Sequence, residues 1–178
     1  AQPKVNDLPA QAATPASVPG AAPAADVAGA PAAIQTKIIT VTTDVYKADI
    51  DTAGGVIRRL ELLKYRDKVD NTKNQLLFHS DSANGRLYLA QTGLTPAATG
   101  VLPNHNTPFV AKPLVQNGDQ TQLVLEAEQN GVRLTKTFTF HQGDYVIGVR
   151  HDVTNIGTVP VAPSLYLQLQ HDGSKPEG

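Results

Sequence analysis

Apolar and polar residues alternate with a period of two along most of the chain from Lys37 onward. In residues 45–51 the even positions are apolar and most odd positions are charged, which is typical of a strand with one buried face. A turn is expected over 52–55, because Gly54 and Gly55 accept positive φ angles. These patterns predict strands over 37–43, 45–51, 56–63, 75–79 and 86–90, followed by a loop over 94–108.

Strong turn signals divide the second half of the chain into closely spaced strands. Asn130-Gly131 is the strongest of them, because both residues tolerate the positive φ angles of a two-residue hairpin turn. Further turns are expected at 117–119, 141–144 and 155–158. The predicted strands are 109–116, 121–129, 132–140, 145–153 and 161–170. Strands joined by such short turns favour an antiparallel meander and hence a β-sandwich.

The alternation also assigns faces to three of these strands. We expect one side of each to be buried and the other to be polar, as in antiparallel sheets with one solvated face. The predicted apolar sides comprise Leu134, Phe138 and Phe140, then Tyr145, Ile147, Val149 and Val153, and finally Leu165, Leu167 and Leu169. No amphipathic helix of useful length is indicated. The fold class predicted is therefore all-β.

The composition changes sharply near Ile34. Residues 1–34 are mostly Ala, Pro, Gln, Val and Gly, with few charges and no aromatic residue. Such a segment cannot bury enough apolar surface to offset its ordering entropy, so we predict a disordered Ala/Pro-rich linker over 1–34 and a β-sandwich domain over 35–178. The segment 10–33 is too rich in Ala and Pro for a membrane span, and it lacks the pattern of a signal peptide.

The net charge and the absence of Cys and Met restrict the classes of function that the chain can have. Fifteen basic and sixteen acidic residues leave the chain nearly neutral, without the basic stripe that nucleic-acid binding requires. The densest basic group is Arg58-Arg59 with Lys64, Arg66 and Lys68; we interpret it as a solvated strand end and loop, with lipid or phosphate contact as the less favoured alternative. The absence of Cys excludes disulfides and thiolate sites and fits a periplasm. The absence of Met indicates a piece of a longer protein.

Candidate catalytic chemistry is sparse. The sequence contains no Gly-x-Ser-x-Gly elbow, phosphate loop, His-Glu-x-x-His motif or dinucleotide-binding glycine pattern. His141 and His151 lie on adjacent predicted strands, with His141 at a hairpin tip and His151 in mid-strand. We interpret His151 as a buried or half-buried residue satisfied by a hydrogen bond. The carboxylates show no spacing that singles out an acid/base pair, and Glu126 and Glu128 fit a solvated strand face. We therefore predict no catalytic, cofactor-binding or metal-binding residue, and the sequence leaves the partner-binding residues unidentified.

Three stretches together resemble one known family. They are TDVYKADIDTAGGVIRRLELLKY at 43–65, YLAQTGL at 88–94 and LTKTFTFHQGDYVIGVRHDVTNIGTVPV at 134–161. Their order and spacing behind an Ala/Pro-rich tether resemble the large periplasmic domain of the YidC-type membrane protein insertases of Gram-negative bacteria. The Lys-Thr-Phe, Gly-Asp-Tyr and Gly-Gly elements are its specific parts.

This resemblance implies a large twisted antiparallel sandwich, the supersandwich also found in galactose mutarotases, placed in the periplasm as part of an inner-membrane protein. It implies a non-enzymatic domain without cofactors, which contacts accessory subunits of the Sec translocon and nascent membrane proteins. It also implies a preceding transmembrane helix and a later helical bundle, both outside this chain. Domains of this family continue beyond the strand at 161–170, so the chain is expected to be truncated at its C-terminal side, with open strand edges.

Two other functions stay open at this point. A mutarotase-like carbohydrate-binding or carbohydrate-active protein would need a His and a carboxylate on one concave sheet, with aromatic residues to stack on a sugar. The chain has no Trp, and aromatic residues make up only 5% of it, which argues against this alternative. A purely structural spacer cannot be separated from a scaffolding and interaction domain on the sequence alone.

Overall fold

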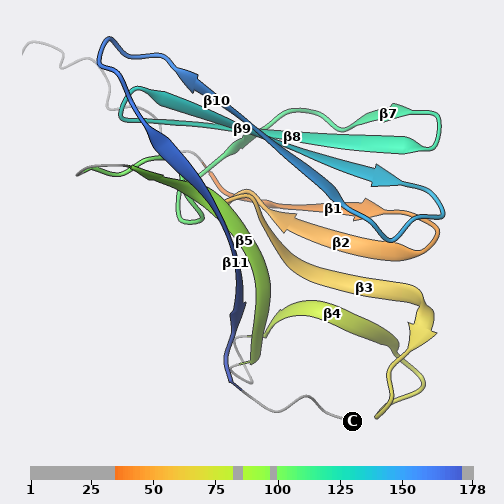
Figure 1. Cartoon of the computed structure of the whole chain (residues 1–178). Helices are drawn as coiled ribbons and strands as arrows, with labels where there is room; N and C mark the ends of the chain where they lie inside the picture. The colour runs from red at the N-terminus through yellow and green to blue at the C-terminus, as the bar shows by residue number, and fades with distance from the viewer. Residues whose placement is uncertain (1–34, 82–85, 97–99, 174–178) are drawn as a thin grey trace, which may run out of the picture. The chain divides into compact units, whose positions relative to one another are not determined.

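The computed structural model describes residues 35–81, 86–96 and 100–173, and the linker predicted over 1–34 lies outside them. Within these ranges every regular element is a strand, and every strand pairing is antiparallel. The strands form two sheets that face each other (Figure 1). This arrangement confirms the predicted all-β sandwich.

Sheet one has six strands in the order β1-β2-β3-β4-β5-β11. Their bounds are β1 (Ile38–Thr42), β2 (Tyr46–Asp51), β3 (Val56–Arg66), β4 (Asn74–Asp81), β5 (Arg86–Pro96) and β11 (Pro163–His171). Sheet two has the order β10-β9-β8-β6, and β7 also pairs with β8. Its strands are β6 (Val110–Ala111), β7 (Val115–Asn117), β8 (Gln120–Gln129), β9 (Val132–His141) and β10 (Gly148–Asn155).

The core lies between the two sheets and follows the predicted alternation where both sheets cover it. Along β9 every second side chain from Val132 to Phe140 is buried. On β2 the buried apolar positions are Tyr46, Ala48 and Ile50, as the even-position pattern predicted, and Asp51 at the end of the strand is buried as well. Each Å² of apolar surface removed from water contributes about 25 cal/mol, so these inner faces are the main source of stability. The loop residues Leu102 and Phe109 also join this core.

The β5 strand is longer than predicted, and its extra length changes the topology. The alternation indicated a strand over 86–90 and a loop from 94, whereas β5 runs to Pro96. Residues 88–96 of β5 pair with β11, and Leu94 lies opposite Leu165. The predicted meander therefore holds for β8, β9 and β10, but β11 crosses to sheet one. Local alternation carries no information about a partner strand so distant in sequence.

Proline divides the strand that was predicted over 109–116. The structure has two short pieces, β6 and β7, with Pro113 between them. Proline has no N–H to donate to a strand ladder, so pairing with β8 is interrupted there. The strand predicted over 145–153 is also displaced, because β10 begins only at Gly148.

Positive φ angles occur at the two turns where the sequence required them. Asn130 has φ 49° and Gly131 φ 76°, which places both residues of the β8–β9 hairpin turn in the left-handed region. Gly54 has φ 84° in the turn between β2 and β3. There the backbone of the loop at His105 approaches so closely that a Cβ on Gly54 would lie 1.9 Å from the His105 carbonyl oxygen.

The close approach at Gly54 predicts a large cost for one added methyl group. Gly54→Ala forces both a left-handed alanine and a shift of the backbone at His105. Gly118→Ala is the matched control, because Gly118 has φ 62° and open space around its Cβ position. We expect Gly118→Ala to cost about 1 kcal/mol of unfolding free energy, and Gly54→Ala to cost several times more, as measured by urea denaturation. Equal losses would contradict the close packing of this loop.

Candidate functional site

A lysine occupies the centre of the sandwich. Lys136 is fully buried and lies on β9 opposite His151 of β10. Its Nζ donates a hydrogen bond to the carbonyl oxygen of Gly54 at 2.7 Å and another to that of Thr92 at 2.8 Å. The side chain thus joins β9 of sheet two to β5 and the β2–β3 turn of sheet one. Sequence analysis missed this role, although the alternation places position 136 on the apolar side between Leu134 and Phe138.

Two opposing effects act on the charge of this lysine. Burial lowers the pKa of Lys136 to about 7, because the ammonium group loses its hydration. The two carbonyl acceptors and the Phe109 ring, whose centroid lies 4.9 Å from Nζ, favour the ammonium form instead. The side chain has no exposed surface, so it acts as a cross-link between the sheets and is not accessible as a nucleophile.

The histidine next to this lysine confirms its predicted role. His151 is half-buried, and its Nε2 lies 2.8 Å from the Thr92 hydroxyl. Burial and the neighbouring Lys136 lower the pKa of His151. His141 contacts Gln120 at the far end of β9, five positions from the residue that faces His151. The structure therefore does not bring the two histidines together.

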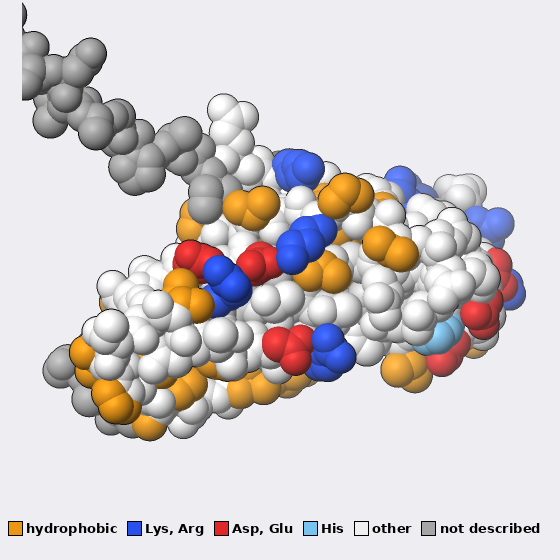
Figure 2. All heavy atoms as spheres, turned by 90° about the horizontal axis from the view of Figure 1, so that it is seen from above, with side chains coloured by type: hydrophobic (Ala, Val, Ile, Leu, Met, Phe, Trp, Pro, Cys, Tyr) orange, Lys and Arg blue, Asp and Glu red, His pale blue; other side chains and the backbone are white. Residues whose placement is uncertain are grey.

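The carboxylates form ion pairs and turn contacts. Glu126 pairs with Lys112 and Arg133, and Glu128 pairs with Arg133, so both acids lie on a solvated face as predicted. Across residues 35–81, 86–96 and 100–173, no group of three or more His, Asp or Glu side chains is arranged to hold a metal ion. Figure 2 shows the molecule from above, with Lys and Arg side chains interspersed among Asp and Glu.

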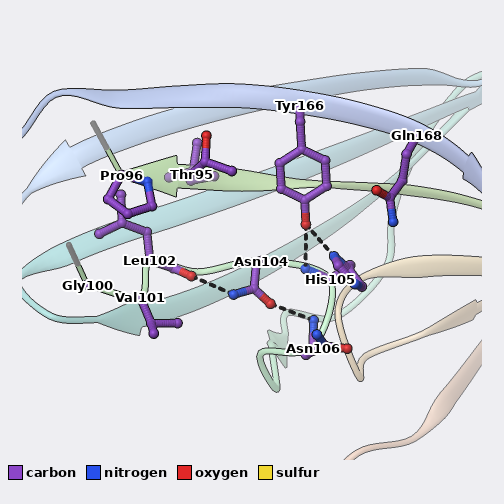
Figure 3. A pocket seen from close by; sticks show the side chains of 11 residues that line it. Thr95, Pro96, Gly100, Val101, Leu102, Asn104, His105, Asn106, Tyr166 and Gln168 are labelled. Carbon is purple, nitrogen blue, oxygen red and sulfur yellow. Dashed lines mark hydrogen bonds between the residues drawn. The ribbon is translucent and has the colours of Figure 1, made fainter. Parts of the chain in front are cut away.

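A small pocket lies between β5, β11 and the loop at 100–106. Its volume is about 350 Å³, and none of its lining side chains is a carboxylate. Tyr166 packs over Gly93, and its hydroxyl contacts the backbone N and the ring Nδ1 of His105 (Figure 3). The Asn104 amide donates to the Leu102 carbonyl oxygen at 2.9 Å. Several of the polar groups of this pocket thus hold the loop in place, and the pocket offers no pair of carboxylates for acid/base chemistry.

The inner faces of the outermost strands β10 and β11 are exposed, contrary to the prediction. Cross-strand neighbours share a face, and Val149 pairs with the buried Phe138 while Leu165 pairs with the buried Leu94. These side chains therefore point to the interior side of their sheets. No described strand lies beyond β10 or β11 to cover them. The exposed fractions are 36% for Val149, 42% for Val153, 55% for Leu165, 74% for Leu167 and 58% for Leu169.

The comparison with protein families gives one match over most of the chain. The family described as the YidC periplasmic domain matches residues 38–178. A protein named membrane protein insertase YidC from Janthinobacterium sp. (strain Marseille) is 50% identical over 171 residues, covering 92% of this chain and 29% of the relative. The proteins of the same name from Herminiimonas arsenicoxydans and Cupriavidus taiwanensis are 47% and 49% identical, covering 96% of this chain and 29% and 30% of themselves.

The chain spans less than a third of the length of these relatives. The part of the chain that the structure describes contains no helix able to cross a membrane. The similarity thus concerns one domain of a longer kind of protein, and it covers all eleven strands.

The buried lysine predicts a specific dependence of stability on pH. Lys136 has a folded pKa of about 7, below its unfolded value of about 10.5. Between these values the unfolded chain binds more protons, so the unfolding free energy rises with pH. We expect a rise of up to about 1.4 kcal/mol per pH unit between pH 7.5 and 9, measured by urea denaturation.

Two variants isolate the contribution of this lysine. Lys136→Met should abolish most of the rise, because it removes the titrating group. Lys112→Met should preserve it, because Lys112 is solvent-exposed. A wild-type protein whose stability stays constant over this range would show that the carbonyl acceptors keep Lys136 charged.

Proposed function

The chain belongs to the YidC periplasmic domain family, and from this premise we propose that it is a non-catalytic scaffolding and interaction domain of a membrane protein insertase. Its residues 35–178 form part of a periplasmic sandwich, and residues 1–34 form the linker that connects it to the rest of an inner-membrane protein. The domain supports the insertion and folding of membrane proteins, alone or with the Sec translocon. Its partners are accessory subunits of the translocon and nascent membrane proteins.

The exposed inner faces of β10 and β11 are the observation that carries this proposal. Among the described residues, the inner faces of the outermost strands β10 and β11 carry five exposed large apolar side chains, namely Val149, Val153, Leu165, Leu167 and Leu169. Exposed apolar strips of this kind mark surfaces that another segment covers. We propose that later strands of the longer protein extend both sheets over this strip, which leaves the outer faces for partner contacts.

The carbohydrate alternative has less support. A sugar-processing site needs a carboxylate near a histidine and an aromatic platform. The pocket at His105 and Tyr166 has the histidine and one aromatic ring but no carboxylate in its lining. The spacer alternative differs from ours only in lacking a partner, so a binding measurement separates the two.

Amide hydrogen exchange tests both parts of the proposal. In the full-length insertase, we expect amides of β11 and of the outer edge of β10 to exchange more slowly than in the isolated chain, because added strands pair with them. Amides of β9 serve as the internal control, because β8 and β10 flank that strand in both samples. Identical exchange at β10 and β11 would contradict the continuation of the sheets.

A second arm adds the soluble periplasmic parts of Sec accessory subunits to the full-length protein. New protection confined to one outer face or edge of the sandwich would support the interaction role and identify the surface. His141→Ala and His151→Ala are expected to leave that protection unchanged, apart from a modest loss of stability. No new protection in this domain would contradict its contact with those subunits and favour the spacer alternative.

A further inference from the structure

The hairpin between β3 and β4 uses its acidic side chains to build its own turn. Residues 67–73 connect the two strands and project from the sandwich (Figure 1). Asp67 Oδ1 accepts hydrogen bonds from the backbone N of Val69 at 2.8 Å and of Asp70 at 3.0 Å. Asp70 accepts from the Thr72 backbone N and pairs with Lys73 at 2.9 Å. Both oxygens of Asp70 and one oxygen of Asp67 are therefore engaged within the hairpin.

Two cations of the hairpin remain without an acidic partner. Within the described parts of the chain, Arg66 contacts only the neutral Asn74 amide, at 2.9 Å, and Lys68 takes part in no ion pair. The basic residues that precede them are different, because Arg59 pairs with Glu61 and Lys64 pairs with Asp44. Lys64, Arg66 and Lys68 are all exposed, as the interpretation of this basic group as a solvated strand end and loop predicted.

A shallow cavity beside the hairpin is lined by more cations than anions. Its volume is about 230 Å³, and it is lined by Arg59, Glu61, Arg66, Thr72, Lys73, Asn74 and Leu76. Both oxygens of the single carboxylate in this lining are engaged, one by Arg59 at 2.7 Å and the other by the Asn74 amide at 2.8 Å. Lys73 is paired with Asp70, so Arg66 is the cation of this lining that pairs with no carboxylate among the described residues, and its remaining N–H groups can donate to an anion.

The tip of the same hairpin is apolar and exposed. Val69 lies between Lys68 and Asp70, and 66% of its surface is accessible. Tyr65, at the end of β3, is 55% exposed. An apolar side chain at a protruding tip, with Lys68 beside it and Arg66 three positions before it, fits the boundary between lipid headgroups and acyl chains.

We propose that the β3–β4 hairpin is a contact site for an anionic bilayer surface, with Val69 at the acyl boundary and Arg66 and Lys68 on lipid phosphates. This inference rests on the proposed function in one respect: a domain of an inner-membrane protein is held beside a bilayer. Each cation near such a surface contributes about 1 kcal/mol, so the hairpin alone binds weakly. Attachment to the membrane raises the effective concentration and makes this weak contact sufficient to orient the domain.

The absence of tryptophan from the chain gives a direct test. Val69→Trp places a single fluorophore at the hairpin tip, and Val115→Trp places one on β7, where the side chain is 57% exposed. Each chain is attached through an N-terminal polyhistidine tag to vesicles that contain nickel-chelating lipid in phosphatidylcholine, with or without an equal part of phosphatidylglycerol. We expect blue-shifted emission and quenching by brominated acyl chains only for Val69→Trp, only on phosphatidylglycerol vesicles, and reversed by high salt.

Charge variants identify the cations that make the contact. Arg66→Gln with Lys68→Gln, in the Val69→Trp chain, should abolish the blue shift. Lys112→Gln with Arg150→Gln removes the same amount of charge elsewhere on the surface and should preserve it. Unchanged unfolding midpoints of these chains confirm that they are folded.

Three outcomes would overturn the proposal. Equal shifts for Val69→Trp and Val115→Trp would show unspecific adsorption, and a shift on pure phosphatidylcholine vesicles would remove the role of the cations. Suppression of the shift by millimolar inorganic phosphate at constant ionic strength would assign the site to a free anion instead of a lipid. All three outcomes are independent of the Sec subunits, so failure here leaves the scaffolding proposal intact.

Discussion

A buried lysine side chain and the backbone carbonyls around it hold the two sheets in one arrangement. Lys136 reaches across the apolar core to the oxygens of Gly54 and Thr92, and each contact requires its segment to stand at a fixed place. The β2–β3 turn supplies one oxygen only because glycines let it fold in the left-handed region against the neighbouring loop. A buried polar group is costly unless it is fully paired, so this network favours one relative position of the sheets.

The surface shows two kinds of apolar exposure that have different physical settings. Along β10 and β11 the exposed apolar residues belong to the inner faces of the sheets, on the same side as the buried core residues of β9 and β5. At the β3–β4 hairpin, a single valine projects from a turn that its own aspartates stabilise, with cations beside it. The exposed inner faces of β10 and β11 suit coverage by further strands of the sandwich. The tip of the β3–β4 hairpin suits a charged and partly apolar partner such as a lipid surface.

Sequence patterns predicted the fold where local chemistry decides it. The Asn130-Gly131 turn and the buried even positions of β2 follow from backbone sterics and from one-sided burial. The placement of β11 beside β5 did not follow, because strand pairing depends on distant residues. For the candidate site, the half-buried state of His151 was predictable from its register. The role of Lys136 was not predictable in this way. Alternation shows that this lysine faces inward, but it does not show which carbonyl oxygens accept its hydrogen bonds.

The pairing of β11 with β5 also bears on how the chain assembles as it emerges. Strands β1 to β5 are complete in the first part of the sequence, yet the sheet they form gains its last strand only after all of sheet two has been made. During that interval the edge of β5 offers unpaired N–H and C=O groups to any neighbouring strand. Contacts of such long sequence separation form slowly. Until β11 is made, this edge can therefore pair with the same edge of another copy of the chain, and the completion of β11 removes that route to self-association.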